Sequence, residues 1–299
     1  MSNPRVLLLG GHGKIARLLT PLLLNRSWDV TSVIRNPDHT SDILKLGQGK
    51  KGKVEVLVSS LDDVKSVDDA KAIVDRAKPD YVVWAAGAGG KGGPLRTYTI
   101  DRDTAKYFIT ATFTNPSITK VLLISHIGSR RKQPPWLSAD TWARFEHINQ
   151  DVLPDYYQAK LAADEKRFQA ILLRPGPLMD APATWKVELG KTKEVVLEGG
   201  VPANVSREDV AIVADRLLAR DDTRGWLDLL GGDDEIEEAV ERAVRDRVDA
   251  VEGEDVDKIS VPEVFIICWF VFTFHRLKSA LYEYVSLPPR WLQVSVVAI

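Results

Sequence analysis

Residues 5–16 read RVLLLGGHGKIA, and this stretch decides the fold. The apolar run at 6–9 is typical of a strand that is covered on both faces. Gly10, Gly13 and Ala16 follow with the spacing G-x-x-G-x-x-A, and a helical pattern begins at Lys14. This spacing provides a tight turn, a backbone that can approach a pyrophosphate, and a small residue where helix meets strand. The helix N-terminus adds free N–H groups for an anion. The residues that we predict around the dinucleotide phosphates are Gly10, Gly11, His12, Gly13, Lys14 and Ile15.

Short apolar runs alternate with helical patterns over the first 230 or so residues. The predicted strands are 6–9, 30–34, 54–58, 81–84, 121–124, 171–173 and, last, 226–230. The predicted helices are 14–24, 64–78, 97–114, 158–169, 207–219 (capped by Ser206) and an amphipathic one at 236–251. This alternation predicts an α/β fold, a doubly wound parallel sheet of the Rossmann type.

Domain boundaries follow from the same pattern. We expect residues 1–256 to form the dinucleotide-binding domain, with substrate-binding segments at about 129–155 and 176–204. Prolines after Arg174 predict loops in the second segment. Residues 257–299 are an atypical apolar and aromatic tail.

Composition narrows the class of protein. Of the 299 residues, 44% are hydrophobic, and the net charge of −2 gives no reason to expect a nucleic-acid partner. The single cysteine, Cys268, forms no internal disulfide, and the N-terminus is not a secretory signal. No apolar run reaches 18 residues, so we expect no spanning segment and a cytoplasmic location.

The end of the second predicted strand favours NADP over NAD as the cofactor. NAD-selective domains usually carry an acidic residue there, which binds the ribose hydroxyls. This chain has Arg35 followed by Asn36, and a guanidinium suits a 2′-phosphate. The alternative is that Arg35 is a solvated residue at a strand end.

A candidate catalytic pair lies between the fifth and sixth strands. Tyr156 and Lys160 have the spacing Y-x-x-x-K, which places them on one face of a helix. A nearby ammonium favours the phenolate, so the tyrosine can exchange a proton with a substrate oxygen. Lys160 can also bind the nicotinamide ribose. Ser125 or Ser129, after the fifth strand, can bind the substrate carbonyl, and we favour Ser125.

Together with Ala85-Ala86-Gly87 and Arg174-Pro175-Gly176-Pro177, these motifs resemble the short-chain dehydrogenase/reductase superfamily. The similarity is greatest to its atypical, NAD(P)-binding, NmrA-like and epimerase-like branch, and it covers roughly residues 5–230. The resemblance implies that Ala85, Ala86 and Gly87 run beside the cofactor and that Pro175 lies near the nicotinamide. Family members often have an acidic residue near the adenine, where this chain has Leu61 before Asp62.

Three functions stay open from the sequence. The first is an NADP-dependent oxidoreductase that acts on a small carbonyl or hydroxyl compound. The others are an NAD(P)-dependent sugar-nucleotide epimerase or dehydratase, and a non-catalytic NADP(H)-sensing regulator. We expect no metal, because His126 and His147 lack partners at ligand spacing and His12 belongs to a turn.

The role of the tail is equally open. It can dock on the domain, form an oligomer contact, or meet a membrane surface or protein partner. It departs from the family pattern, so residues 261–299 can also be non-native additions.

Overall fold

A computed structural model of the protein describes residues 3–89, 92–152, 154–155, 157–158, 160, 170–192 and 203–254. The chain divides into two units, Met1–Ser260 and Val261–Ile299, and the described residues all belong to the first. The tail expected at 257–299 and most of the helix expected at 158–169 lie outside the described residues. Within the part that is described, no helix is long and apolar enough to cross a membrane.

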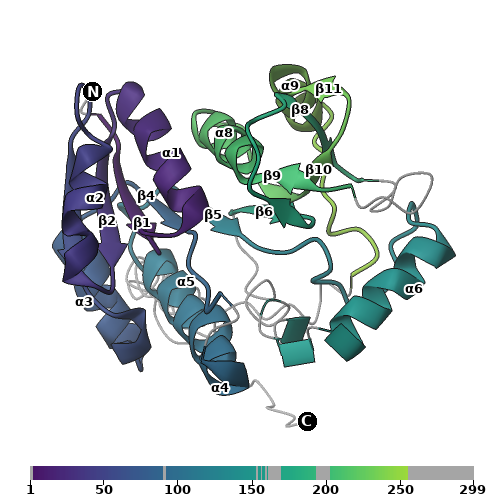
Figure 1. The fold of residues 1–299 in the computed structure, drawn as a ribbon, viewed down its shortest axis with the longest axis horizontal. Helices are drawn as coiled ribbons and strands as arrows, with labels where there is room; N and C mark the ends of the chain where they lie inside the picture. The colour runs from purple at the N-terminus through teal and green to yellow at the C-terminus, as the bar shows by residue number, and fades with distance from the viewer. Residues whose placement is uncertain are drawn as a thin grey trace, which may run out of the picture. The chain divides into compact units, whose positions relative to one another are not determined.

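One large sheet organises the described residues, with the strand order β3-β2-β1-β4-β5-β6-β10-β8-β11 (Figure 1). The strands are β1 Arg5–Leu9, β2 Asp29–Ile34, β3 Val54–Val58, β4 Tyr81–Trp84, β5 Lys120–Ile124, β6 Ile171–Pro175, β8 Lys186–Gly190, β10 Gly225–Gly231 and β11 Asp234–Glu235. The run from β3 to β10 is parallel, whereas β8 and β11 continue it with antiparallel pairings. The doubly wound parallel sheet predicted from the sequence is therefore confirmed.

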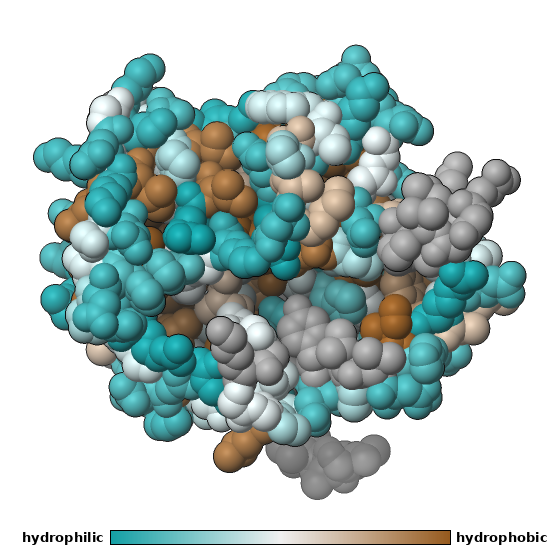
Figure 2. Space-filling model, in the orientation of Figure 1, coloured by the Kyte–Doolittle hydropathy of each residue, from teal (hydrophilic) through white to brown (hydrophobic). Residues whose placement is uncertain are grey.

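Helices cover both faces of the sheet (Figure 1). Their bounds are α1 Lys14–Asn25, α2 Thr40–Lys45, α3 Val67–Ala77, α4 Gly93–Thr97, α5 Ala105–Phe113, α6 Ala139–His147, α8 Arg207–Leu218 and α9 Ile236–Arg245. Val6 and Leu8 of β1 share a buried cluster with α1, α8 and α9, whereas Leu7 and Leu9 share one with α3 and α5. An uninterrupted apolar run suits a strand with both faces buried. Hydrophilic side chains cover most of the described surface in Figure 2, and apolar ones show in gaps between them.

Several helix limits differ from the sequence prediction. The helix expected at 64–78 begins only at Val67, because Ser66 accepts a hydrogen bond from the Asp69 N–H and caps it there. The helix expected at 97–114 is α4, then a π-helical segment η3 (Tyr98–Thr104), then α5. α9 ends at Arg245 rather than continuing to 251. The predicted cap of α8 is confirmed, since Ser206 accepts from the Asp209 N–H.

The predicted substrate segments contain more regular structure than expected. The segment at 129–155 includes α6 and a π-helical segment η4, Ile148–Val152. The segment at 176–204 includes β8 and the short strand β7 (Leu178–Met179), which pairs in parallel with β9 (Val205–Ser206) just after the segment. The strand at 226–230 is not the last one, because β11 follows it.

The sheet changes winding direction between β1 and β4, where the strand order reverses. In open α/β sheets, ligands bind beyond the carboxyl ends of the strands at such a point. The loops after β1, β2 and β4 all meet there.

Candidate functional site

A cavity of about 210 Å³ lies beyond the carboxyl ends of β1, β2, β3 and β4. Its lining residues are Gly10, His12, Gly13, Val33, Ile34, Arg35, Ser59, Leu61, Asp62, Ala85, Ala86, Gly87, Ala88, Arg96 and Ile100. The predicted cofactor contacts that line it are Gly10, His12, Gly13, Arg35, Leu61, Ala85, Ala86 and Gly87. The sequence therefore identified residues from four separate segments that the fold brings to one cavity.

The glycine loop has room for nothing larger than glycine at two positions. Gly10 has φ +82°, and a Cβ there would lie 2.6 Å from the Cα of Ala86. A Cβ on Gly11 would lie 1.8 Å from the Ser32 hydroxyl oxygen. The Gly13 N–H donates to the Gly10 carbonyl at 2.8 Å, and Gly13 is the N-cap of α1. The loop thus presents close-lying backbone and a helix N-terminus to the cavity, which is how such folds bind pyrophosphate.

Lys14 is directed away from the cavity lining. Its ammonium pairs with Asp180, whose other carboxylate oxygen accepts from Arg207 at 2.7 Å. The hydrogen bond from Lys14, followed by the charges of Arg207 and Lys14, outweighs desolvation and lowers the pKa of Asp180. Lys14 therefore ties the glycine loop to the segment after β7.

Three further predicted contacts also lie outside the cavity lining. Ile15 packs against the buried cluster beneath α1. The Asn36 side chain accepts from the Asp38 N–H at 3.1 Å and so begins the short 3-10 helix η1, Pro37–His39. Pro175 is the buried last residue of β6. Their side chains contribute to the shape of the loops around the cavity.

Arg35 lines the cavity and shares its carboxylate partner, Asp62, with Arg96. Its guanidinium is 3.3 Å from Asp62, and Arg96 binds both oxygens of the same carboxylate at 2.9 and 3.1 Å. Burial raises the pKa of Asp62, but the hydrogen bonds from Arg96 and Arg35 lower it more, and the net change is downward. Arg35 and Arg96 therefore place two guanidiniums beside the cavity. The Arg35 side chain is 61% exposed, so a ligand can reach it.

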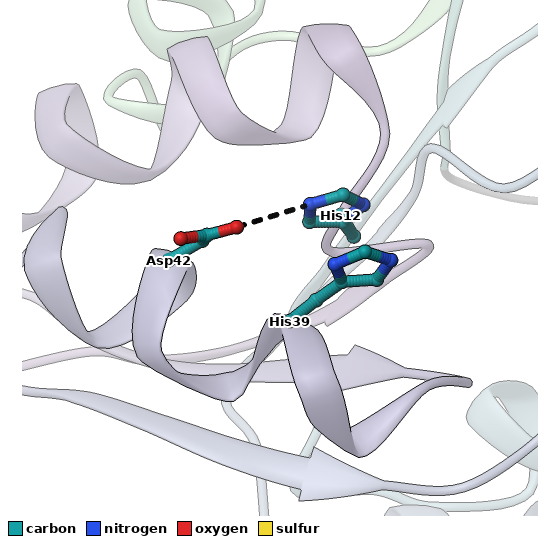
Figure 3. Close-up of side chains that lie close together, drawn as sticks. All are labelled: His12, His39 and Asp42. Carbon is teal, nitrogen blue, oxygen red and sulfur yellow. Dashed lines mark ion pairs between the residues drawn. The ribbon is translucent and has the colours of Figure 1, made fainter.

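His12 meets a second histidine that the sequence analysis did not connect with it. The rings of His12 and His39 stack with centroids 3.7 Å apart and an interplanar angle of 4° (Figure 3). Asp42, in the first turn of α2, lies 3.9 Å from His12 Nε2. Burial, then the charges of His39 and Arg17, lower the pKa of His12 in spite of Asp42.

The predicted catalytic pair is only partly within the described residues. Tyr156 lies outside them. Lys160 is buried, and its ammonium donates to the Ile124 carbonyl at 3.3 Å, at the end of β5. It also lies 3.4 Å from a carboxylate oxygen of Asp101, whose other oxygen accepts from the Ala88 N–H at 2.9 Å. Asp101 thus connects Lys160 with the loop after β4.

Ser125 follows β5 directly and is buried, with 5% of its surface exposed. It is next in the chain to Ile124, whose carbonyl binds Lys160, so the structure places the two predicted residues at the same strand end. Ser129, the alternative, is fully buried. His126 lies between them, and burial together with the charges of Arg174 and Lys160 lowers its pKa to about 4. His126 is therefore neutral at neutral pH.

Tyr157 is excluded as a replacement for Tyr156. Its hydroxyl donates to the Arg130 carbonyl at 2.8 Å. Burial, followed by the charge of Glu254, raises its pKa, which is the wrong direction for a phenolate at working pH.

A buried cluster of charged residues lies at β6 and β10. Arg130 and Arg174 are 1% and 0% exposed, and both approach Asp228 of β10, at 2.6 and 3.6 Å. The two guanidiniums lie over the rings of Trp136 and Trp226, respectively. Arg174 also donates to the backbone carbonyls of the loop after β5. Because Arg174 is inside the protein, it positions that loop rather than touching a ligand.

Sequence reasoning missed Asp62, Arg96, Asp101 and His39 as parts of the site. Asp101 did leave a signal, because it is a carboxylate on a helical face otherwise made of Ile100, Thr104 and Phe108, all buried. A buried charge without a local partner points to a partner elsewhere in the fold. Arg96 and His39 left no comparable signal, since both lie in short polar helices.

Comparisons with known proteins agree with this geometry. The model of a family described as NAD(P)H-binding matches residues 10–221. The UPF0659 protein C216.03 of Schizosaccharomyces pombe is 32% identical over 211 residues, covering 68% of this chain and 79% of that protein. The sugar epimerase YhfK of Bacillus subtilis, itself uncharacterized, is 26% identical over 244 residues, covering 80% of this chain and 99% of that protein. A solved structure from Bacillus halodurans, provisionally named an NAD-dependent epimerase/dehydratase, is 26% identical with a TM-score of 0.64, covering 80% of this chain and 100% of that one.

Proposed function

The chain belongs to the NAD(P)H-binding family, and we propose that it is an NADP-dependent oxidoreductase of the short-chain dehydrogenase/reductase type. Its substrate in this proposal is a small carbonyl or hydroxyl compound. The observation that carries the proposal is the meeting of the glycine loop and Arg35 in one cavity at the switch point of the sheet.

The residues of this cavity fit a dinucleotide with a 2′-phosphate. A Cβ at Gly10 would overlap Ala86, so this position must lack a side chain. In this proposal the bare backbone there lies close to a phosphate of the dinucleotide. Arg35 is 61% exposed, and it shares its carboxylate partner Asp62 with Arg96. A guanidinium binds a phosphate with two parallel hydrogen bonds, and NAD offers no group of that charge at the same position.

The chemical step is assigned to the strand end of β5. A bound nicotinamide supplies or accepts the hydride there. In this proposal Ser125 binds the substrate oxygen and Tyr156 exchanges the proton with it. In this proposal the positive charge of Lys160 favours the phenolate of Tyr156, while Asp101 and the Ile124 carbonyl keep the ammonium of Lys160 in place.

The first test is a binding titration of the purified protein with NADPH and, separately, with NADH. We expect tighter binding of NADPH, and we expect Arg35→Ala to weaken it about 10- to 100-fold, the range for hydrogen bonds to charged groups. NADH affinity should change little. Arg5→Ala is the matched control, because Arg5 is also exposed and also lies 3.3 Å from one carboxylate, that of Asp80. Equal loss of NADPH and NADH affinity in Arg35→Ala would contradict the assignment of Arg35.

A second candidate is a sugar-nucleotide epimerase or dehydratase, which the names of the Bacillus subtilis and Bacillus halodurans relatives favour. The two activities differ in what happens to the cofactor. A reductase consumes NADPH in proportion to a carbonyl substrate, whereas an epimerase converts a sugar nucleotide with no net change in absorbance at the NADPH band. A screen with both substrate classes, followed by absorbance and by product analysis, separates them.

Tyr156→Phe separates either enzyme from a cofactor-sensing regulator. An enzyme should lose turnover and keep NADPH affinity, because the hydroxyl acts in the chemical step. Turnover that survives this substitution would remove Tyr156 from the mechanism. Absence of turnover in the wild-type chain, with tight NADPH binding, would favour the regulator.

A further inference from the structure

Three potential metal ligands meet where the loops after β1 and β2 lie side by side. His12 comes from the glycine loop, His39 from the end of η1 and Asp42 from the first turn of α2. The ligand atoms that they offer all lie within 4.8 Å of one another. Figure 3 shows the two rings stacked and the Asp42 carboxylate beside the His12 ring.

No hydrogen bond joins His12 to Asp42, because the 3.9 Å between His12 Nε2 and the Asp42 carboxylate is too long for one. Stacking of the two imidazoles uses the ring faces, and their nitrogen lone pairs lie in the parallel ring planes. One ring must therefore turn about its side-chain torsions for both nitrogens to bind the same ion. The His12 and Asp42 side chains are 32% and 48% exposed, so a hydrated ion can reach them.

We propose that His12, His39 and Asp42 bind a divalent transition-metal ion at this place. Two imidazole nitrogens and one carboxylate oxygen are a ligand set typical of Zn²⁺, with one position left for water or another oxygen ligand. Mg²⁺ and Ca²⁺ are excluded, since they prefer oxygen ligands throughout. Arg17 and Lys45 are the cations that face the three ligands, and Asp42 supplies the opposing negative charge. His12 also lines the dinucleotide cavity, so the ion would lie at its edge.

The test is a calorimetric titration of the full chain, untagged and stripped with a chelator, with Zn²⁺ in the absence of dinucleotide. We expect one ion per chain at this site. His39→Ala should weaken its binding at least about tenfold, since losing even an outer-shell partner of a zinc ligand costs that much. Co²⁺ in place of Zn²⁺ should give a visible absorption band that His39→Ala abolishes.

His147→Ala is the matched control. His147 is an exposed histidine that lies 2.7 Å from Asp151, but it has no second histidine beside it within the described residues. Its replacement should leave the Zn²⁺ affinity unchanged. Asp42→Asn, at an exposed position, gives a second test if His39→Ala does not fold. Equal Zn²⁺ affinity in the wild-type chain and in these two ligand variants would overturn the proposal, as would the absence of saturable binding.

Discussion

The carboxyl edge of the sheet has two halves that are built differently. Around β1, β2 and β4 the site consists of glycine backbone and of charged side chains near the surface, such as Arg35. Around β5, β6 and β10 it rests on charges inside the protein, where Arg130, Arg174 and Asp228 are at most 2% exposed. One half offers groups that a ligand can reach, whereas the other half holds its loops through charged groups inside the protein.

This difference predicts which substitutions change ligand affinity and which change the stability of the fold. Exposed ion pairs contribute little to folding, whereas removal of one partner from a buried pair leaves an uncompensated charge. We therefore expect substitutions near β1 and β2 to change ligand affinity, and substitutions in the buried cluster to change the free energy of unfolding.

The largest effect is expected for Asp228→Asn. The amide keeps the shape of the side chain but removes a carboxylate that faces both Arg130 and Arg174. We expect the free energy of unfolding to fall by about 3–5 kcal/mol, measured by urea denaturation. Asp246→Asn, which breaks a surface pair with Arg245, should cause no measurable change. A loss no greater than that of the control would mean that the buried cluster does not stabilise this half.

Gly10→Ala should have the next largest effect, and on binding. The added Cβ would lie 2.6 Å from the Ala86 Cα, so the loops after β1 and β4 must move apart. We expect NADPH affinity to fall about 10- to 100-fold, which corresponds to the roughly 1–3 kcal/mol that overpacking of this kind costs. Gly49→Ala is the control: Gly49 also has a positive φ, +69°, but its Cβ would meet nothing within 4 Å. Wild-type NADPH affinity in Gly10→Ala would contradict the assigned loop.

The two halves also differ in how far the sequence predicts them. Gly10 and Arg35 could be identified because each directly follows a predicted strand, and Gly13 because it keeps the G-x-x-G spacing of the loop. The order of the strands then brings the residues together. Asp62 and Arg96 could not be paired in advance, because they are 34 residues apart and the pairing depends on where α4 begins.

The features that the sequence prediction missed can also be explained from the local sequence. β8 reads Lys-Val-Glu-Leu-Gly, an alternating pattern that predicts a half-buried strand, but the surrounding prolines directed the prediction toward a loop. The π-helical segment η3 has no sequence period of its own. The resemblance places Pro175 near the nicotinamide, whereas its neighbour Arg174 is a buried residue of β6 that approaches Asp228 of β10 and has a structural role.

Asp101→Asn tests a residue that contacts both halves, through the Ala88 N–H and Lys160. We expect the free energy of unfolding to fall by about 2 kcal/mol, the scale of a hydrogen bond to a charged group. NADPH affinity should also fall, because Ala88 lines the cavity. Asp103→Asn breaks an exposed pair with Arg102 and is the control. If the two variants behave alike, Asp101 does not link the halves.

The smallest effect is expected for Asp62→Asn, whose stability is compared with that of the wild-type chain at several pH values. Desolvation raises the pKa of Asp62, but the hydrogen bonds from Arg96 and Arg35 lower it by more. The pKa in the folded state therefore lies below the ordinary 3.8. The stabilisation is then complete above the unfolded pKa and is lost as the pH falls through the folded pKa. We expect the free energy of unfolding of the wild-type chain to exceed that of Asp62→Asn by less than about 1 kcal/mol near pH 7. The gap, measured by urea denaturation, should close below about pH 4 and shrink with added salt, which screens exposed charges. A gap that salt leaves unchanged would mean that Asp62 behaves like the buried cluster, and the distinction between the two halves would fail at this residue.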